Sequence, residues 1–246
     1  MRRIGLIAGT GAAALLPADA GRLAPVATPW GAPSAPLRTW QQGGCQFVYL
    51  ARHGEPAAIA PHRVNYRANI RALQAQGVTA IIGINAVGGI TPAATPGRLV
   101  LPHQLVDYTW GREHTFCDGT GEPLRHIEFD PPFDEALRRE LAAAAAAAGI
   151  DLLTSATYGV TQGPRLETAA EIDRLARDGC DLVGMTAMPE AALAREAGLA
   201  YAICAVVVNR AAGRLPPGSS IHAEMAGNLA RGMAAVGRLL EAFCSR

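Results

Sequence analysis

Residues 4–11 read IGLIAGTG, and this stretch decides the fold class. Its first residues are mostly apolar and the run stops at Gly9-Thr10-Gly11, which is typical of a buried strand that ends in a glycine turn. The stretch QFVYLA at 46–51 repeats the arrangement, because it runs directly into Arg52-His53-Gly54. Each of these two strands is therefore predicted to carry a polar loop at its carboxyl end.

Further strands alternate with helices along the rest of the chain. Strands are predicted at 79–90, 99–106, 181–185 and 200–208, and helices at 65–76, 134–148, 168–178, 188–197 and about 221–243. This alternation predicts an α/β fold, with a central, mostly parallel or mixed sheet flanked by helices. We expect one domain over residues 1–246, with its ligands at the carboxyl ends of the strands.

Composition narrows the function classes. The net charge is +1 and basic residues form no run, so no nucleic-acid partner is expected. Arg2-Arg3 before an apolar stretch imitates a secretory signal, but Gly5, Gly9 and Gly11 interrupt that stretch, and no apolar run reaches the about 18 residues of a membrane span. Five cysteines without CxxC spacing are typical of reduced thiols in a cytoplasmic protein, and no metal-ligand spacing occurs.

Two loops carry groups that suit an oxyanion. Gly9-Thr10-Gly11 offers backbone N–H groups and a hydroxyl, while Arg52-His53 offers a fixed cation and a second donor. The glycine loop has neither the lysine of a P-loop nor the third glycine of a dinucleotide site. Plain turn geometry for the glycines, and a surface-loop role for the arginine, stay open on these two motifs alone.

Longer motifs resemble the purine nucleoside and methylthioadenosine phosphorylase family. These are VNYRANIRAL at 64–73, YGVTQGPRLETAAE at 158–171 and VGMTAMPEAALARE at 183–196, together with the GTG and RHGEP loops. The resemblance runs from about residue 4 to 240. It implies a pentosyltransferase of phosphorylase fold, a homotrimer with active sites near the subunit boundaries, and inorganic phosphate as co-substrate with no metal or organic cofactor.

The resemblance also implies the site residues. Members of the family bind phosphate at the positions matching Thr10, Arg52, His53, Ala86 and Thr186, and the residue matching Met185 lies against the ribose. Asn85 stands where methylthioadenosine phosphorylases usually have threonine, and it is included in the predicted phosphate site. Glu190 in the MPEA motif is predicted to fix a loop rather than to act as a general base.

Base recognition is predicted at Glu167 and Asn209. A carboxylate at Glu167 accepts from N1–H of a 6-oxopurine, and an asparagine donates to O6 while accepting from a protonated N7, so both are predicted catalytic residues. Adenine-specific relatives have aspartate at the position matching Asn209 and again two residues later, where this chain has Ala211. The pair therefore favours hypoxanthine or guanine. The alternative for Asn209 is a turn cap after the strand.

Two features of the sequence give conflicting predictions for the 5′ substituent of the sugar. NAVGGI at 85–90 and HQLVDYTWGREHTF at 103–116 resemble bacterial methylthioinosine phosphorylases, whose 5′ pocket accepts a thioether. His222 lies 13 positions after Asn209, where relatives that bind a 5′-hydroxyl have histidine and methylthio-selective relatives have an apolar residue. His222 is therefore predicted to discriminate at the 5′ position, or else to be a polar residue of the last helix's first turn.

The favoured function is phosphorolysis of S-methyl-5′-thioinosine, giving hypoxanthine and 5-methylthioribose 1-phosphate. A general 6-oxopurine phosphorylase acting on inosine and guanosine is the nearest alternative, and a methylthioadenosine phosphorylase is less favoured. A non-catalytic nucleotide-binding module is the alternative from another class. It is disfavoured because no GxGxxG with an acidic residue about 20 positions later occurs.

Overall fold

The computed structural model describes residues 1–119 and 121–245. In this part of the chain eleven strands form one mixed sheet. The strands are β1 (Arg2–Ala8), β2 (Gly21–Arg22), β3 (Arg38–Gln42), β4 (Cys45–Ala51), β5 (Ala80–Gly89), β6 (Leu99–Val100), β7 (Gln104–Asp107), β8 (Leu152–Leu153), β9 (Thr157–Val160), β10 (Leu182–Gly184) and β11 (Ala200–Arg210). The helices are η1 (Ala12–Leu15), η2 (Pro61–Arg63), α1 (Tyr66–Ala75), α2 (Glu135–Ala147), α3 (Ala169–Arg177), α4 (Ala187–Glu196) and α5 (Ile221–Cys244).

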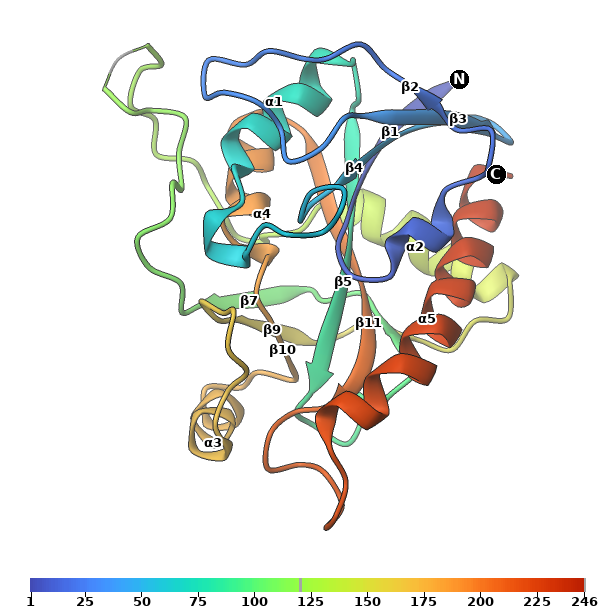
Figure 1. Ribbon diagram of the computed structural model, residues 1–246, viewed down its shortest axis with the longest axis vertical. Coiled ribbons are helices and arrows are strands. Elements are labelled where there is room, and N and C mark those ends of the chain that lie inside the picture. Colours follow the sequence, from blue (N-terminus) through green and yellow to red (C-terminus); the bar gives the residue numbers. More distant parts are fainter. Residues whose placement is uncertain (120, 246) are drawn as a thin grey trace.

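The two longest strands, β5 and β11, pair in parallel through the middle of the molecule (Figure 1). Side chains along a strand alternate between its two faces. Ile81 and Val87 of β5 accordingly pack in one core cluster, whereas Ile82 and Ile84 pack in the other. Both faces of this strand are thus buried, which explains why its sequence is almost continuously apolar.

Strand register brings the starts of two polar loops beside a polar residue of β5. In β1, Ala8 pairs with Ala51 of β4 on one side and with Ile84 of β5 on the other. All three strands run in the same direction, so the residues after these paired positions lie side by side. Gly9 and Arg52 begin the loops after β1 and β4, and Asn85 lies within β5, which continues to Gly89.

Helices cover both faces of the sheet. Helices α2 and α5 pack on the side of Ile82 and Ile84, and α1 and α4 pack on the opposite side (Figure 1). Side-chain caps define where these helices begin. Asp134 caps α2, and Thr168 forms a capping box with Glu171 at the start of α3. Ser220 caps α5 through a hydrogen bond from the backbone N–H of Ala223.

The α/β fold class, with its mixed sheet flanked by helices, is confirmed. The predicted strand over 99–106 is wrong, because it is two strands separated by Leu101, Pro102 and His103, and proline cannot donate to a strand ladder. Strand β11 continues to Arg210 through an irregularity between Val207 and Asn209, so Asn209 lies within the strand rather than in a turn after it. The short strands β2, β3, β8 and β9 were not predicted. Within the described residues, no helix is both long and apolar enough to cross a membrane.

Helix α5 approaches β11 closely at Gly232. A Cβ built on Gly232 would overlap Cγ1 of Val206 in the strand beneath, whereas a Cβ on Gly237 meets nothing within 4 Å. We expect Gly232→Ala to lower the unfolding free energy by about 1–3 kcal/mol through overpacking. The matched variant Gly237→Ala should raise it by about 0.5–1 kcal/mol, because alanine is the better helix former. Urea unfolding of both variants checks this, and equal shifts would contradict the close packing.

Candidate active site

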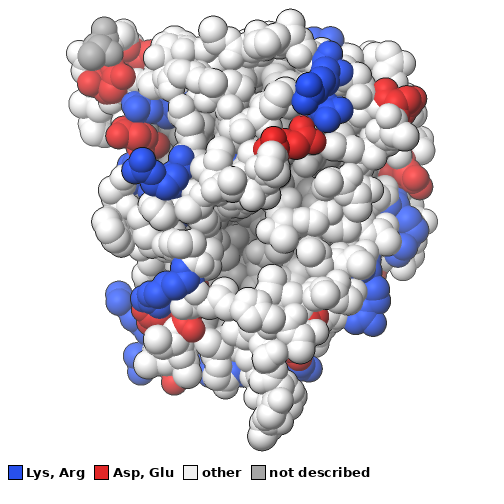
Figure 2. All heavy atoms as spheres, in the orientation of Figure 1, with Lys and Arg blue, Asp and Glu red and all other residues white. Residues whose placement is uncertain are grey.

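A cavity of about 500 Å³ lies where the loops after β1 and β4 meet the second half of β5. Figure 2 shows the face of the molecule hollowed near its centre, with mostly uncharged residues around the hollow. The cavity is lined by every predicted site residue except His222, namely Thr10, Arg52, His53, Asn85, Ala86, Glu167, Met185, Thr186, Asn209 and Ala211. A larger hollow of about 970 Å³, between η1, β3 and α5, contains none of them.

Arg52 is the most enclosed charged residue of the site, with 1% of its surface exposed. Its Nε and Nη2 donate to the two carboxylate oxygens of Glu190, at 2.8 and 2.9 Å. Nη2 also contacts the Ile7 carbonyl and Asn85 Oδ1, while Nη1 donates to the Ile84 carbonyl at 3.2 Å. Within the described residues this leaves one N–H of Nη1 without a protein acceptor, available to a ligand in the cavity.

Glu190 is fully buried and also accepts from the Tyr201 hydroxyl at 2.8 Å. Burial alone would lower the pKa of Arg52, but the adjacent carboxylate raises it above its ordinary value. Burial, followed by the Glu190 charge, raises the pKa of Tyr201, so its hydroxyl stays protonated and donates. Glu190 therefore fixes the side chain of Arg52, rather than a loop as predicted, and its oxygens are occupied.

Asn85 connects the arginine to Thr186. Its Nδ2 donates to Thr186 Oγ1 at 3.0 Å and to the Tyr158 hydroxyl at 3.3 Å, and its Oδ1 accepts from Arg52. Both N–H groups of the amide are thus used inside the protein. Because Thr186 Oγ1 accepts from Asn85, its own hydrogen is free to point into the cavity. Thr186 can therefore donate directly to a ligand in the cavity, and Asn85 orients the Thr186 hydroxyl.

His53 faces the same space with a defined tautomer. Its Nδ1 lies 2.8 Å from the Ile59 carbonyl, which can only accept, so this nitrogen carries the hydrogen. Burial, and then the charge of Arg52, lower the pKa of His53, which favours the neutral ring. A Cβ built on Gly9 would lie 3.2 Å from Arg52 Nη1 and 3.5 Å from His53 Nε2. Gly9 thus leaves room for a ligand beside both nitrogens, and Nε2 acts as an acceptor.

The two predicted base-recognition residues also line the cavity, and Asn209 pairs with Gly88, beyond Asn85 along β5. Glu167 accepts from the Thr161 hydroxyl through Oε1 at 2.6 Å, which orients the carboxylate. Asn209 is 7% exposed and donates through Nδ2 to the Arg210 carbonyl at 2.6 Å. One N–H and Oδ1 of Asn209 remain for a ligand. Ala211 is buried beside them and adds no polar group.

The wall formed by α5 is apolar. Ile221 and Met225 line the cavity, one helical turn apart, while His222 is exposed and lies outside the lining. The Arg210–Glu224 ion pair at 2.6 Å ties the end of β11 to this first turn of α5. The structure does not bring His222 to the site within one chain, and its role in 5′ discrimination stays a prediction.

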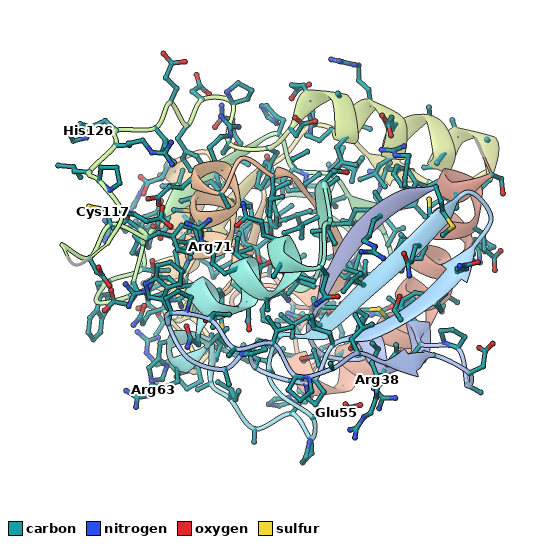
Figure 3. The ribbon with its side chains drawn as sticks, turned by 90° about the horizontal axis from the view of Figure 1, so that it is seen from above. Arg38, Glu55, Arg63, Arg71, Cys117 and His126 are labelled. Atoms are coloured by element: carbon teal, nitrogen blue, oxygen red, sulfur yellow. The ribbon has the colours of Figure 1, made fainter. Side chains whose placement is uncertain are left out.

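Other candidate groups lie elsewhere. His126 and Cys117 lie on the long segment after β7, at the outer edge of the molecule and far from Arg38 and Glu55 (Figure 3). Cys117 is half-buried, and the other four cysteines are buried and free. Among residues 1–119 and 121–245, no cluster of three or more His, Cys, Asp or Glu side chains could hold a metal ion.

Sequence analysis missed three supporting residues: Tyr158, Thr161 and Tyr201. Each contacts a predicted site residue through its hydroxyl. The two tyrosines could have been found from the sequence, because each lies in an apolar strand and a buried Tyr hydroxyl usually has a hydrogen-bond partner. The partner of Tyr158 lies on β5, and the partners of Thr161 and Tyr201 lie in the loop before α3 and in α4, so the sequence alone does not identify them.

Comparison with known proteins identifies the family of this chain. The sequence model of the Phosphorylase superfamily matches residues 3–245. A probable S-methyl-5′-thioinosine phosphorylase of Xanthomonas campestris pv. campestris is 48% identical over 243 residues, covering 93% of this chain and 97% of that protein. One from Pseudomonas syringae pv. tomato is 53% identical over 209 residues, 85% of each chain. A solved structure of methylthioadenosine phosphorylase from Schistosoma mansoni in complex with adenine has a TM-score of 0.92 at 30% identity, covering 100% of this chain and 91% of that chain. On these matches the chain belongs to the phosphorylase superfamily.

Proposed function

We propose that this protein cleaves S-methyl-5′-thioinosine with inorganic phosphate, giving hypoxanthine and 5-methylthioribose 1-phosphate. The observation that carries the proposal is one cavity with two chemically distinct ends. Arg52 and Thr186 offer donors to an anion at one end, beside His53, while Glu167 and Asn209 offer base-recognition groups at the other. A nucleoside that spans them has its ribose, and the bond to be broken, between phosphate and base.

The chemistry needs few protein groups. An oxygen of hydrogen phosphate attacks C1′ as the C1′–N9 bond breaks, and the bonding electron pair moves to the purine. The proton that the hydrogen phosphate gives up reaches N7 of the purine through solvent. Fixed donors and acceptors stabilise the charges that develop, and phosphate held beneath the sugar supplies both nucleophile and negative charge. Phosphate is then a co-substrate, and we propose that no metal or organic cofactor takes part.

The base end supports a 6-oxopurine. The free oxygen of the Glu167 carboxylate suits N1–H, and Asn209 can donate to O6 while accepting from N7–H. Adenine has an acceptor at N1 and a donor at N6, so it would face Glu167 with the wrong polarity. The buried Ala211 supplies no carboxylate to compensate.

The 5′ end supports a thioether. Ile221 and Met225 present apolar surface to the cavity, and a 5′-hydroxyl buried against them would lose its hydrogen bonds to water. The Xanthomonas and Pseudomonas relatives carry methylthioinosine phosphorylase names. We favour methylthioinosine over inosine and guanosine for both reasons.

We also propose that the enzyme is a cytoplasmic homotrimer. Trp110 and Leu124 are 71% and 70% exposed, and both lie on the long segment between β7 and α2. Large exposed apolar side chains on one segment are typical of an interface. Free cysteines support a reducing compartment.

The experiment that tests the function compares kcat/KM for methylthioinosine, inosine, guanosine and methylthioadenosine, with and without phosphate. We expect methylthioinosine to be preferred and turnover to require phosphate. Preference for inosine or guanosine would identify a general 6-oxopurine phosphorylase, and binding without turnover would identify a non-catalytic module. Asn209→Asp should lower kcat/KM for oxopurine nucleosides by at least about 100-fold, because the O6 donor is lost. Unchanged kinetics in that variant would contradict the base assignment.

Two adjacent residues of α5 give a matched test of the 5′ wall. Ile221→Asn should reduce the preference for methylthioinosine over inosine by about tenfold or more, because a polar group then faces the thioether. His222→Ala should leave this ratio within about twofold, since His222 lies outside the cavity. Ratios of kcat/KM measure both variants. A large shift in the His222 variant alone would show that His222 sets 5′ selectivity.

The lowered pKa of His53 predicts a pH effect on stability. The unfolded chain titrates near the ordinary histidine pKa of about 6.5, while the folded chain takes up this proton only at lower pH. Below about pH 6.5 the unfolded state therefore binds more protons at this residue, and folding loses stability as pH falls. The difference in unfolding free energy between wild type and His53→Asn should decrease from about pH 7.5 to 5.5 in phosphate-free buffer. A constant or increasing difference would contradict the lowered pKa.

A further inference from the structure

Arg112 is a second buried arginine, on the segment that follows β7, and it lines neither the phosphate end nor the base end of the cavity. Its exposed fraction is 9%. Burial lowers the pKa of this guanidinium, although an arginine keeps its charge inside proteins. A buried cation is costly unless its donors are satisfied, so the partners of Arg112 indicate what its burial achieves.

Those partners are uncharged oxygens: the Tyr66 hydroxyl at 3.4 Å and, with the shorter hydrogen bonds, groups of the segments 161–162 and 185–188. Nη1 donates to the carbonyls of Met185 and Met188 at 2.8 and 2.6 Å. Nη2 donates to the carbonyls of Thr161 and Gln162 at 3.3 and 2.8 Å, and Nε donates to Gln162 Oε1 at 3.2 Å. In the described residues these hydrogen bonds involve no carboxylate. The guanidinium is thus a bridge between the segments 161–162 and 185–188.

Each bridged segment carries a proposed nucleoside contact. Thr161 donates to Glu167, so the position of the first segment determines the orientation of the base-binding carboxylate. The second segment contains Met185, proposed to contact the ribose. The phosphate end is held by a separate network, in which Arg52 is fixed by Glu190.

A second contact holds the bridge in place from outside. The Gln162 amide accepts from the Trp110 backbone N–H at 3.3 Å and donates to the Trp110 carbonyl at 3.1 Å. Arg112 also lies over the Tyr66 ring, with its Cζ 5.8 Å from the ring centroid. The guanidinium is therefore fixed between α1, the loop after β7 and the cavity wall.

We infer that Arg112 is a positioning residue that holds the base and ribose contacts of the nucleoside at a fixed separation through the Thr161, Gln162, Met185 and Met188 carbonyls. The inference rests on the proposed function and deepens it. A misplacement of about 1 Å at such contacts can lower a rate about 100-fold. Lysine cannot replace Arg112 fully, because its three donors radiate from one nitrogen and cannot reach both segments as the planar fork does.

Three variants test this role. Arg112→Met removes the donors and keeps much of the length, Arg112→Lys keeps the charge, and Arg174→Met removes an exposed arginine from nearby α3 as the matched control. We expect kcat/KM for methylthioinosine to fall about 100-fold in the methionine variant and less in the lysine variant, with KM for methylthioinosine raised about tenfold or more and KM for phosphate within about threefold of wild type. The Arg174 variant should match wild type. Unfolding curves establish that the compared samples are folded, and if Arg112→Met does not fold, Arg112→Lys carries the test.

The outcomes separate the two proposals. A merely structural role would lower the active fraction, so kcat would fall equally for every substrate while both KM values stayed constant. That result, or Arg112 variants with kcat/KM within about threefold of wild type, would overturn the positioning role and leave the proposed function intact. A wild-type enzyme without phosphate-dependent turnover would overturn the proposed function and, with it, the inference.

Discussion

The site depends on one buried ion pair, between Arg52 and Glu190. Arg52 follows β4, Glu190 lies in α4, and Tyr201 of β11 adds a third hydrogen bond, so the pair joins the end of β4 to two consecutive elements, with Glu190 138 residues further along the chain. Two charges removed from water are costly, and losing one partner of such a pair typically costs about 3–5 kcal/mol because the other is left unpaired. The ion pair therefore stabilises the fold and also fixes the geometry of the anion-binding end.

This pairing also determines how an anion is bound. The charge of Arg52 is balanced by Glu190, and a neutral His53 adds no second cation. A phosphate in the cavity thus meets directed donors, one N–H of Arg52 and the Thr186 hydroxyl, rather than a strong positive field. Directed donors fix the orientation of a nucleophile, which is the main requirement when attack at C1′ must come from one side of the sugar.

Much of the site can be predicted from the sequence, because strand register brings its residues together. Gly9 and Arg52 follow the parallel strands β1 and β4, so their convergence follows from the fold class once each strand end is located, and register places Asn85 of β5 beside them. The resemblance then supplied the roles of Thr186 and Glu167. A residue's role cannot be predicted from the sequence where it depends on a partner far away in the chain. Glu190 binds an arginine 138 residues distant, and no local pattern specifies that contact.

Other differences arise from local geometry. Counting positions from Asn209 aligns His222 with 5′ contacts of relatives, but the Ser220 cap sets the phase of α5, and successive helical residues differ by about 100° in direction. Ile221 and Met225 consequently line the cavity. Pro102, within the predicted 99–106 strand, was a readable signal of the break between β6 and β7.

The most direct test of phosphate-dependent cleavage is ³¹P NMR of the enzyme with methylthioinosine and inorganic phosphate, with hypoxanthine measured in the same sample. The proposed function predicts a new sugar 1-phosphate resonance that grows in equal proportion to hypoxanthine while inorganic phosphate declines. Hypoxanthine release without a phosphate ester would show hydrolysis, and no change in either signal would show that the cavity binds without catalysing; both results would contradict the account.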